Sequence, residues 1–196
     1  MREILTRTTD PAETPVSVGE VKAALSIHTS DDDALITTYL NAAIEHLDGP
    51  LNLLGKSMVS QVWTQAQRAP VSGRLDLRLV PVISVDQITY YDSDNVQQTD
   101  TVSNYDLIKG DDFAYLDPKP GFAWPTTYDR DDALTVTVTT GYADASAVPN
   151  PLKVAIFMLI GSWYARREGL SEGAVLPIPN GFDQLINNHR VRWFGA

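Results

Sequence analysis

Hydrophobic residues recur with a helical period near the start of the chain. Over residues 32–47 they lie three or four positions apart, as on the buried side of an amphipathic helix. The residues concerned are Leu35, Ile36, Tyr39, Leu40, Ala43, Ile44 and Leu47. A shorter pattern of the same kind covers residues 18–27. Each stretch is preceded by the Ser-x-x-acid pattern of a capping box, Ser17 with Glu20 and Ser30 with Asp33. Two helices are therefore predicted here.

A third helical stretch, residues 151–168, is apolar on nearly every side, which is typical of a helix surrounded by other elements. Asn150 is suited to the N-cap and Pro151 to the first helical position. The apolar run of about 14 residues is shorter than the roughly 20 that span a bilayer. The sequence therefore predicts the central buried helix of the fold, and no membrane partner.

Between these helices the hydrophobic period changes to that of strands. Stretches of alternating or β-branched residues predict strands at 58–66, 75–79, 82–91, 105–107, 114–116 and 134–140. Asp92 to Asn95 has the composition of a hairpin turn. The order helix, helix, strands, helix predicts an α+β fold: a small helical bundle with a large inserted antiparallel β-domain and an extended C-terminal tail. The expected parts are an N-terminal arm (1–16), a helical framework (17–57 and 141–170), the β-domain (58–140) and the tail (171–196).

The tail is rich in breakers of regular structure across 171–180, which favours extended backbone there. A short helix is predicted to start at Phe182, and the chain then ends in arginines and aromatics. Such residues are typical of binding anchors. Equally, Trp193 and Phe194 fit a segment that folds back onto the helical core. Both interpretations remain open at this point.

Composition narrows the possible functions. The chain has no cysteine, which excludes disulfides, thiolate zinc sites and cysteine nucleophiles. The formal net charge is −10, which disfavours a freely accessible basic patch for nucleic acid. Residues 86–132 contain eleven Asp against three cations, whereas residues 149–196 contain five Lys and Arg against three acids. This asymmetry suggests two surfaces with different partners, although solubility explains the acidic part equally well. The N-terminus lacks the apolar core of a signal peptide, so a cytoplasmic protein is expected.

Candidate chemistry is sparse. His28, His46 and His189 have no metal-ligand spacing, there is no glycine-rich phosphate loop, and no pair of carboxylates is favoured as acid and base. No catalytic residue, metal or cofactor is therefore expected. The aromatic residues of the acidic block would suit a carbohydrate-binding β-module as the alternative function, but they equally suit a sheet core. They are Tyr90, Tyr91, Tyr105, Tyr115, Phe122 and Trp124.

Several motifs, in this order, resemble the head–tail connector family of tailed bacteriophages and gene transfer agents. The two capped helices at 17–25 and 30–36 resemble the family's opening helices. Leu79 to Val85 followed by Ile88 to Asp92 resembles its strand pair, and Gly141-Tyr142 with the helix ending in Trp163 to Glu168 resembles its central helix. Residues 176–191 are similar to its C-terminal tail. The resemblance covers most of the chain.

The resemblance implies a non-enzymatic structural protein. Such proteins form a ring, typically of twelve copies, beneath the portal vertex, where DNA passes through the central channel. The implied partners are the portal protein, the next connector or stopper protein, and further copies of this chain, which would be monomeric alone. The chain would assemble in the cytoplasm and end in the neck of the particle. The tail would bind the portal through anchors that we expect to be Leu176, Phe182, Arg190, Arg192, Trp193 and Phe194.

Overall fold

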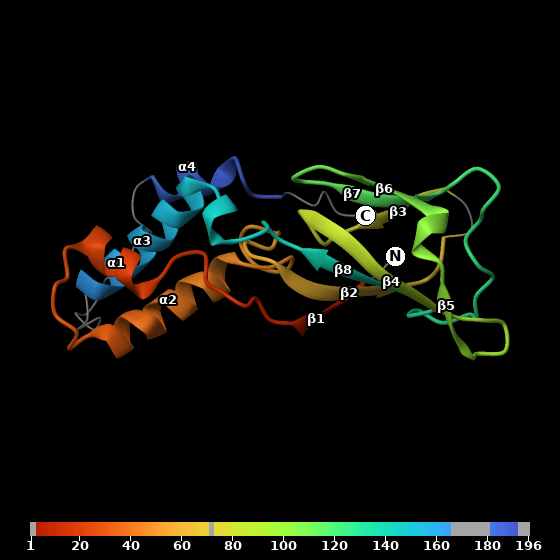
Figure 1. The fold of residues 1–196 in the computed structure, drawn as a ribbon, viewed down its shortest axis with the longest axis horizontal. Helices are drawn as coiled ribbons and strands as arrows, with labels where there is room; N and C mark the ends of the chain where they lie inside the picture. Colours follow the sequence, from red (N-terminus) through yellow and green to blue (C-terminus); the bar gives the residue numbers. More distant parts are fainter. Residues whose placement is uncertain (1–2, 71–72, 166–180, 192–196) are drawn as a thin grey trace, which may run out of the picture.

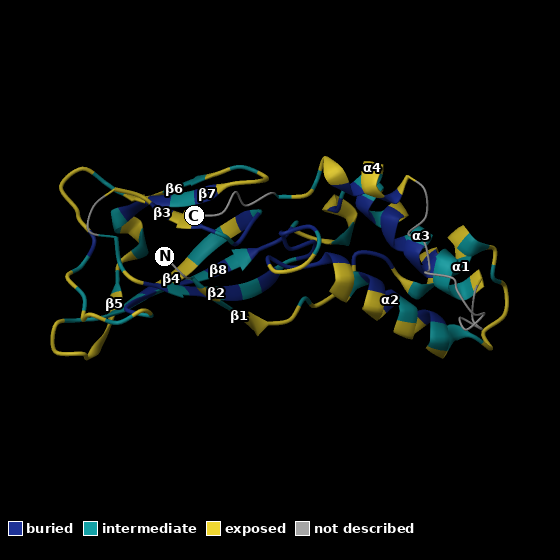
Figure 2. Ribbon diagram, turned by 180° about the vertical axis from the view of Figure 1, so that it is seen from behind, coloured by how far each residue is buried: buried dark blue, intermediate teal, exposed yellow. Residues whose placement is uncertain are grey.

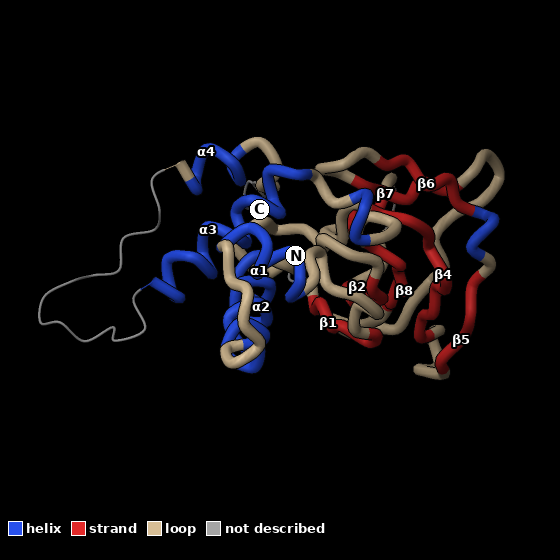
Figure 3. Tube along the Cα trace, turned by 60° about the vertical axis from the view of Figure 1, so that its left-hand side comes forward, coloured by secondary structure: helices blue, strands red, loops and turns tan. Residues whose placement is uncertain are grey.

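The computed structural model describes residues 3–70, 73–165 and 181–191, and these form two lobes placed end to end (Figure 1). One lobe is built mainly from helices and the other mainly from strands (Figure 3). Each lobe has its own cluster of buried hydrophobic side chains. The helices and the strands of the described residues are therefore each organised around a hydrophobic core of their own.

The helical lobe is built from four helices. They are α1 (Val18–Leu25), α2 (Asp33–Leu47), α3 (Asn150–Ala165) and α4 (Phe182–Asn187). The capping box predicted for α1 is present, because Ser17 accepts a hydrogen bond from the Glu20 N–H and the Glu20 carboxylate accepts from the Ser17 N–H at 2.6 Å. At the start of α2 the N-cap residue Asp32 makes no side-chain capping bond, so the second predicted box is not formed there.

Helix α3 is the centre of this lobe, since α1, α2 and α4 all contact it. Its buried positions form one continuous face, which Figure 2 shows in dark blue: Leu152, Ala155, Ile156, Leu159 and Ile160. The opposite face is only partly covered, and Val154 is 42% exposed. The predicted central helix is present. The helix is not buried on every side, because no element among the described residues covers the side that carries Val154.

Five strands of the β-lobe form one antiparallel sheet. In spatial order they are β1 (Ile4–Thr9), β2 (Gln61–Gln67), β8 (Leu134–Thr140), β4 (Val82–Tyr91) and β5 (Gln97–Asp100). Along β2 and β8, buried and half-buried residues alternate, as in a sheet with one face on a core. Strands β4 and β8 match the ranges predicted for them.

A smaller antiparallel sheet covers the large one. It contains β3 (Leu75–Leu77), β7 (Ala114–Pro118) and β6 (Tyr105–Lys109), in that order. Two short 3₁₀ helices, Val102–Asn104 and Ala145–Ala147, lie in connections. The core between the sheets includes Leu77, Ile88, Leu116 and Val136. The β-lobe is thus a two-layered unit with a hydrophobic core between its sheets.

Two strands were not predicted. Strand β1 comes from residues assigned to a loosely ordered arm, and it pairs with β2 from Ile4 opposite Ala66 onward. Strand β5 follows the hairpin turn and pairs with the end of β4. Both are edge strands whose side chains are mostly exposed. Their sequences therefore lack the alternation of hydrophobic residues by which a half-buried strand is recognised.

The connection between the lobes is held by backbone hydrogen bonds. Gly141 follows β8 and donates its N–H to the Pro81 carbonyl at 2.8 Å, and Tyr142 donates to Met58 at 3.2 Å. Gly141 has φ +113°, and a Cβ on it would lie 2.3 Å from the Val59 carbonyl oxygen. Glycine is required here both for its backbone conformation and for the close approach of the two chains.

Candidate interaction surfaces

The C-terminal segment that the structure describes is packed against both lobes. Phe182 and Ile186 of α4 are fully buried in the helical core, and Val191 donates its N–H to the Leu54 carbonyl at 2.8 Å. The Val191 side chain packs against the core of the β-lobe. Residues 181–191 therefore cross from one lobe to the other and are not an extended tail.

The six residues predicted as partner anchors fall into three groups: one is exposed, one is buried, and four lie outside the described residues. Arg190 is exposed at the surface. Phe182 belongs to the helical core and has no surface to offer a partner, because the apolar face of α4 packs on α3. Leu176, Arg192, Trp193 and Phe194 lie outside the described residues. Sequence reasoning placed the start of the short helix correctly but took its buried aromatic for an exposed one.

Two charged side chains are buried where the lobes meet, and Lys56 is the first. Its side chain is only 1% exposed, and its ammonium lies 2.6 Å from the Asp112 carboxylate. It also lies 3.4 Å from the Asp111 carbonyl oxygen. These two residues form the turn between β6 and β7, so the ion pair fixes that turn to the loop after α2. The pair is a structural link, since a buried ammonium needs a close carboxylate.

Asp48 is the second buried charge, and its partners are neutral. The carboxylate accepts a hydrogen bond from the Met58 N–H and from the Gln61 side-chain amide at 2.9 Å. The Gln61 amide oxygen in turn accepts from the Trp63 indole at 2.9 Å. Burial raises the pKa of Asp48, although these hydrogen bonds oppose the shift. No described cation forms an ion pair with it.

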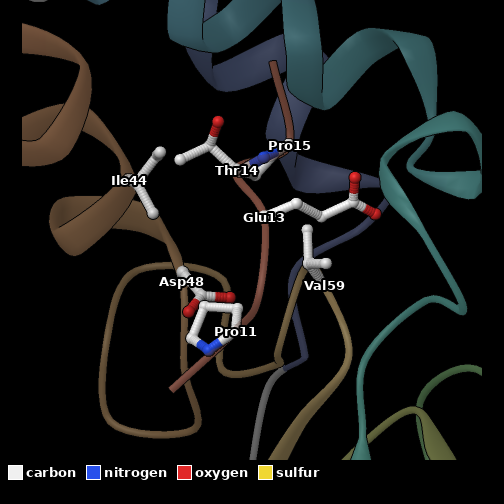
Figure 4. A pocket seen from close by; sticks show the side chains of 7 residues that line it. All are labelled: Pro11, Glu13, Thr14, Pro15, Ile44, Asp48 and Val59. Atoms are coloured by element: carbon white, nitrogen blue, oxygen red, sulfur yellow. The ribbon is translucent and has the colours of Figure 1, made fainter. Parts of the chain in front are cut away.

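Asp48 also lines a small pocket between the N-terminal segment and the end of α2 (Figure 4). The other lining residues are mostly apolar: Pro11, Glu13, Thr14, Pro15, Ile44 and Val59. The Glu13 carboxylate is engaged elsewhere, accepting from the Ala145 N–H at 2.8 Å. A cofactor or substrate site normally offers several convergent polar groups and a volume of about 300 Å³ or more. This pocket offers neither.

The aromatic residues considered for carbohydrate binding do not form one surface. Tyr105 and Trp124 are buried in the β-core, where their rings stack with centroids 4.5 Å apart. The Tyr105 hydroxyl donates to Asp100, and burial together with this bond raises the pKa of Tyr105. Tyr91 is covered by the Arg130 guanidinium, 3.8 Å from its ring centroid. The interpretation of these aromatic residues as part of the sheet core therefore holds for Tyr105 and Trp124.

Tyr115 of this set instead lies on the outer face of the small sheet, beside the exposed Phe113. Phe113 is 53% exposed, and its ring stacks on Tyr115 at 6.5 Å. The Arg74 guanidinium lies 4.7 Å from the Tyr115 centroid on the same face. We call Phe113, Tyr115 and Arg74 the aromatic strip. Sequence reasoning missed Phe113 and Arg74, although the alternation in 113–117 already placed Phe113 and Tyr115 on one side of a strand.

The remaining charged clusters among the described residues are internally paired. Arg68 bonds Asp129 and, at 2.8 Å, Asp131, and Arg130 binds both oxygens of Asp132 at 2.6 and 2.7 Å. Within residues 3–70, 73–165 and 181–191, no group of His, Asp and Glu has a metal-binding arrangement. No helix in the same ranges is long and apolar enough to cross a membrane.

No family model and no curated protein matches the sequence. The structure, however, matches chains of gene transfer agent (GTA) particles over 98% of both chains. They come from the neck of an empty GTA particle computed with C6 symmetry (25% identity, TM-score 0.77), the virion of a native GTA particle (23%, 0.77) and the neck of a native GTA particle computed with C12 symmetry (24%, 0.75). The family resemblance expected from the sequence motifs is confirmed at the level of the whole fold.

Proposed function

We propose that this chain, which has the fold of a chain from the GTA neck, is a structural head–tail connector of a gene transfer agent or tailed phage. One observation carries the proposal: the fold agrees over 98% of both chains, at 25% identity, with a chain from the neck of a GTA particle. A partial or local match would support only a shared module. A match over the full length of both chains supports a shared role.

The connector acts as a ring in the particle neck. The similar necks were computed with C6 and C12 symmetry, which supports a symmetric ring. We propose twelve copies for this chain, and a monomer before assembly. The exposed large hydrophobic residues of the described chain support the monomer, because they are distributed over β1, the loop after α2, β4, the β-lobe turns and α3.

The portal protein and the next connector or stopper are the proposed partners. The exposed Arg190, together with Arg192, Trp193 and Phe194, forms the proposed portal anchor, and Leu176 remains a further candidate. Phe182 is left out because it is a core residue. Assembly takes place in the cytoplasm, and the chain has no catalytic role.

DNA is proposed to pass the ring without being bound. The net charge of −10 supports this, because a wall of carboxylates repels phosphate whereas a basic wall would hold it. The prediction concerns the assembled ring: its channel surface carries a net negative charge. A channel lined by a net positive surface in a structure of the ring would contradict it.

The test of the proposed function is the native mass of the chain with and without its portal protein. We expect a monomer alone and a ring on the portal. Deleting residues 171–196 would remove Phe182 and Ile186 from the core, so the sharper variant ends at Val191 and keeps every described residue. It should fold normally and lose the portal. A full-length chain that does not bind the portal protein would contradict the connector function. A shortened chain that still binds it would contradict only the proposed portal anchor.

A further inference from the structure

The two edges of the five-stranded sheet carry backbone groups that the proposed function has not used. Strands β1 and β5 are the outermost strands of this sheet, and each pairs on one side only within the described part of the chain. We propose that β1 of one copy pairs with β5 of the next copy in the ring, so that neighbouring sheets join edge to edge. The inference rests on the proposed function, because it requires a ring of copies.

Both edges present regular backbone that is suited to a further strand. Every second residue of an edge strand directs its N–H and C=O away from the sheet. The side chains of β1 and β5 are exposed except for the half-buried Leu5 and Asp100, and neither strand contains proline. A bulge interrupts β1 only between Arg7 and Thr9. Residues 4–7 and Gln97–Asp100 are therefore two stretches of equal length that are open to pairing.

The topology determines how the two edges run. The four pairings within the sheet are all antiparallel, so its first and fifth strands point in the same direction. Neighbours in a ring of twelve differ by a rotation of only about 30°, which nearly preserves the direction of a strand. Strand β1 of one copy therefore runs parallel to β5 of the next. This contact joins two different edges, which is the kind of contact that closes a ring.

Aligning the first residues of the two strands gives one specific register. Ile4 then lies beside Gln97, Thr6 beside Thr99, and Arg7 beside Asp100. We call this pairing of residues 4–7 with Gln97–Asp100 of the next copy the edge contact.

The faces of the two sheets agree in this register. The Arg7 guanidinium lies over the Trp63 ring, 5.8 Å from its centroid, and the Asp100 carboxylate accepts a hydrogen bond from the Tyr105 hydroxyl. Trp63 and Tyr105 both belong to the β-core, so Arg7 and Asp100 lie on the core face of the sheet. Successive residues of a strand point to opposite faces, which places Thr6 and Thr99 together on the other face.

Charge complementarity supports a second copy as the occupant of each edge. Asp100 accepts hydrogen bonds from Tyr105 and from the Thr101 N–H at 2.7 Å, but no described cation forms an ion pair with it. Arg7 contacts Asp10 at 2.8 Å, and an arginine has five N–H donors, so several remain for a second carboxylate. Opposite charges side by side on neighbouring strands are stabilising. Each edge thus carries the charge that suits the other edge.

The edge contact is short, which agrees with a monomer before assembly. Two strands of four residues form only a few hydrogen bonds, and a small isolated strand pair is marginal in water. We therefore expect the contact to form when the portal protein holds the copies side by side. A five-stranded sheet is about 24 Å wide, so twelve joined sheets would close a wall roughly 45 Å in radius. A wall of this size leaves space inside it for a DNA channel.

The first test exchanges the two charges. Each variant is mixed with the portal protein, and the rings are quantified by native mass. Arg7→Glu places two like charges at every edge contact and should lower the ring yield about tenfold or more. Adding Asp100→Arg to the same chain should restore most of the yield. Within one copy the two residues lie on opposite edges, about 19 Å apart, so only a contact between copies can explain the rescue.

Lys119→Glu is the matched control. The Lys119 side chain is as exposed as that of Arg7, at 41%, and it likewise contacts an exposed aspartate, Asp106. It lies beside the small sheet, away from both edges of the large one. Rings should form normally from this variant. Circular dichroism of all the monomers shows whether a lower yield comes from misfolding.

The second test does not depend on the charges. The chain has no cysteine, so Thr6→Cys with Thr99→Cys introduces a single possible pair. Neighbouring strands lie about 4.8 Å apart, which is within the Cα separation of a disulfide. Oxidised rings of the double variant should give a ladder of linked copies on a non-reducing gel. Each single variant should remain unlinked.

The outcomes separate this inference from the proposed function. A wild-type chain that stays monomeric with the portal protein contradicts the connector function and the edge contact together. Rings that form normally from Arg7→Glu contradict the edge contact alone, and so do oxidised rings of the double cysteine variant without a ladder. If Arg7→Glu does not fold, the presence or absence of the ladder decides.

Discussion

Asp48 and Lys56 are both buried where the lobes meet, yet their surroundings differ. Lys56 is neutralised by a carboxylate 56 residues away in the sequence, on the β6–β7 turn. Asp48 is surrounded by neutral donors from nearby residues, Met58 and Gln61. The first charge joins two distant segments by an ion pair, whereas the second organises one short stretch of chain by hydrogen bonds.

The difference shows how a buried charge can be tolerated in two ways. The partner of Lys56, Asp112, has a side chain that is 59% exposed, so half of the ion pair remains in water. None of the described cations forms an ion pair with Asp48, and burial raises its pKa because the charged form is poorly solvated. Removing the Lys56–Asp112 ion pair should therefore loosen a long-range contact, whereas neutralising Asp48 should remove the free-energy cost of burying its charge.

The largest effect is expected from loosening the junction that holds both charges. Gly141→Ala would place a Cβ 2.3 Å from the Val59 carbonyl oxygen and force a left-handed φ on alanine. We expect a loss of at least about 3 kcal/mol in the free energy of unfolding. For a chain of this size that lowers the melting temperature by roughly 6 °C or more. Thermal unfolding followed by circular dichroism measures it.

Gly121→Ala is the matched control. Gly121 also has a positive φ, +89°, but nothing lies within 4 Å of an added Cβ. At this position alanine is destabilising only because of the positive φ, by about 1 kcal/mol in the free energy of unfolding. Equal losses for the two variants would show that the close approach of β8 to Val59 is not what makes glycine necessary at 141.

The junction also shows what the sequence could and could not reveal. Helix α2 and strands β4 and β8 were predicted well, because their hydrophobic periods reflect the faces that they bury. The pairing of Lys56 with Asp112 had no such signal, since a lysine is normally exposed and only the tertiary fold brings the β6–β7 turn to it. Long-range ion pairs of this kind have no local pattern in a single sequence.

The candidate surfaces were only partly predictable for the same reason. The sequence identified the end of the chain as rich in arginine and aromatics, but not that Phe182 would be buried against α3. Phe182 lies in a six-residue helix, too short for its hydrophobic period to separate a buried face from an exposed one. The aromatic strip was obscured because Arg74 reaches Phe113 and Tyr115 only when β3 and β7 pair.

The next prediction removes the exposed half of the Lys56 ion pair. Asp112→Ala leaves a buried ammonium without a carboxylate, and breaking a fully buried pair in this way costs roughly 3–5 kcal/mol. Because Asp112 is more than half exposed, water can reach the site, and we expect a smaller loss of about 2 kcal/mol. Urea unfolding measures it. A variant as stable as the wild type would show that the pair contributes nothing to the link between the lobes.

Removing Lys56, the buried half of the ion pair, should lower the free energy of unfolding by less. Lys56→Met replaces the buried ammonium by an apolar side chain of similar length and leaves Asp112 in contact with water. Replacing a buried ion by a packed apolar group is often neutral, so we expect a change within about 1 kcal/mol. The informative result is the order of the two variants in the same urea titration. If Lys56→Met were the less stable, the ammonium would be solvated better than its burial implies.

The smallest effect, and the one that isolates Asp48, depends on pH. Because the native state raises the pKa of Asp48 above its ordinary value of 3.8, the folded protein binds this proton more tightly than the unfolded chain does. The contribution of Asp48 to stability is then fully present below the ordinary pKa and is lost as the pH rises through the native value. Asp48→Asn does not titrate, and its amide, like a protonated carboxyl group, is neutral. The stability of the variant relative to the wild type should therefore increase between about pH 4 and pH 7, by less than the effect of Asp112→Ala.

Urea unfolding of both proteins at several pH values measures the difference. A relative stability that falls with pH would mean that the Met58 and Gln61 hydrogen bonds outweigh the cost of burial, and Asp48 would then stabilise the junction in its charged form as Lys56 does.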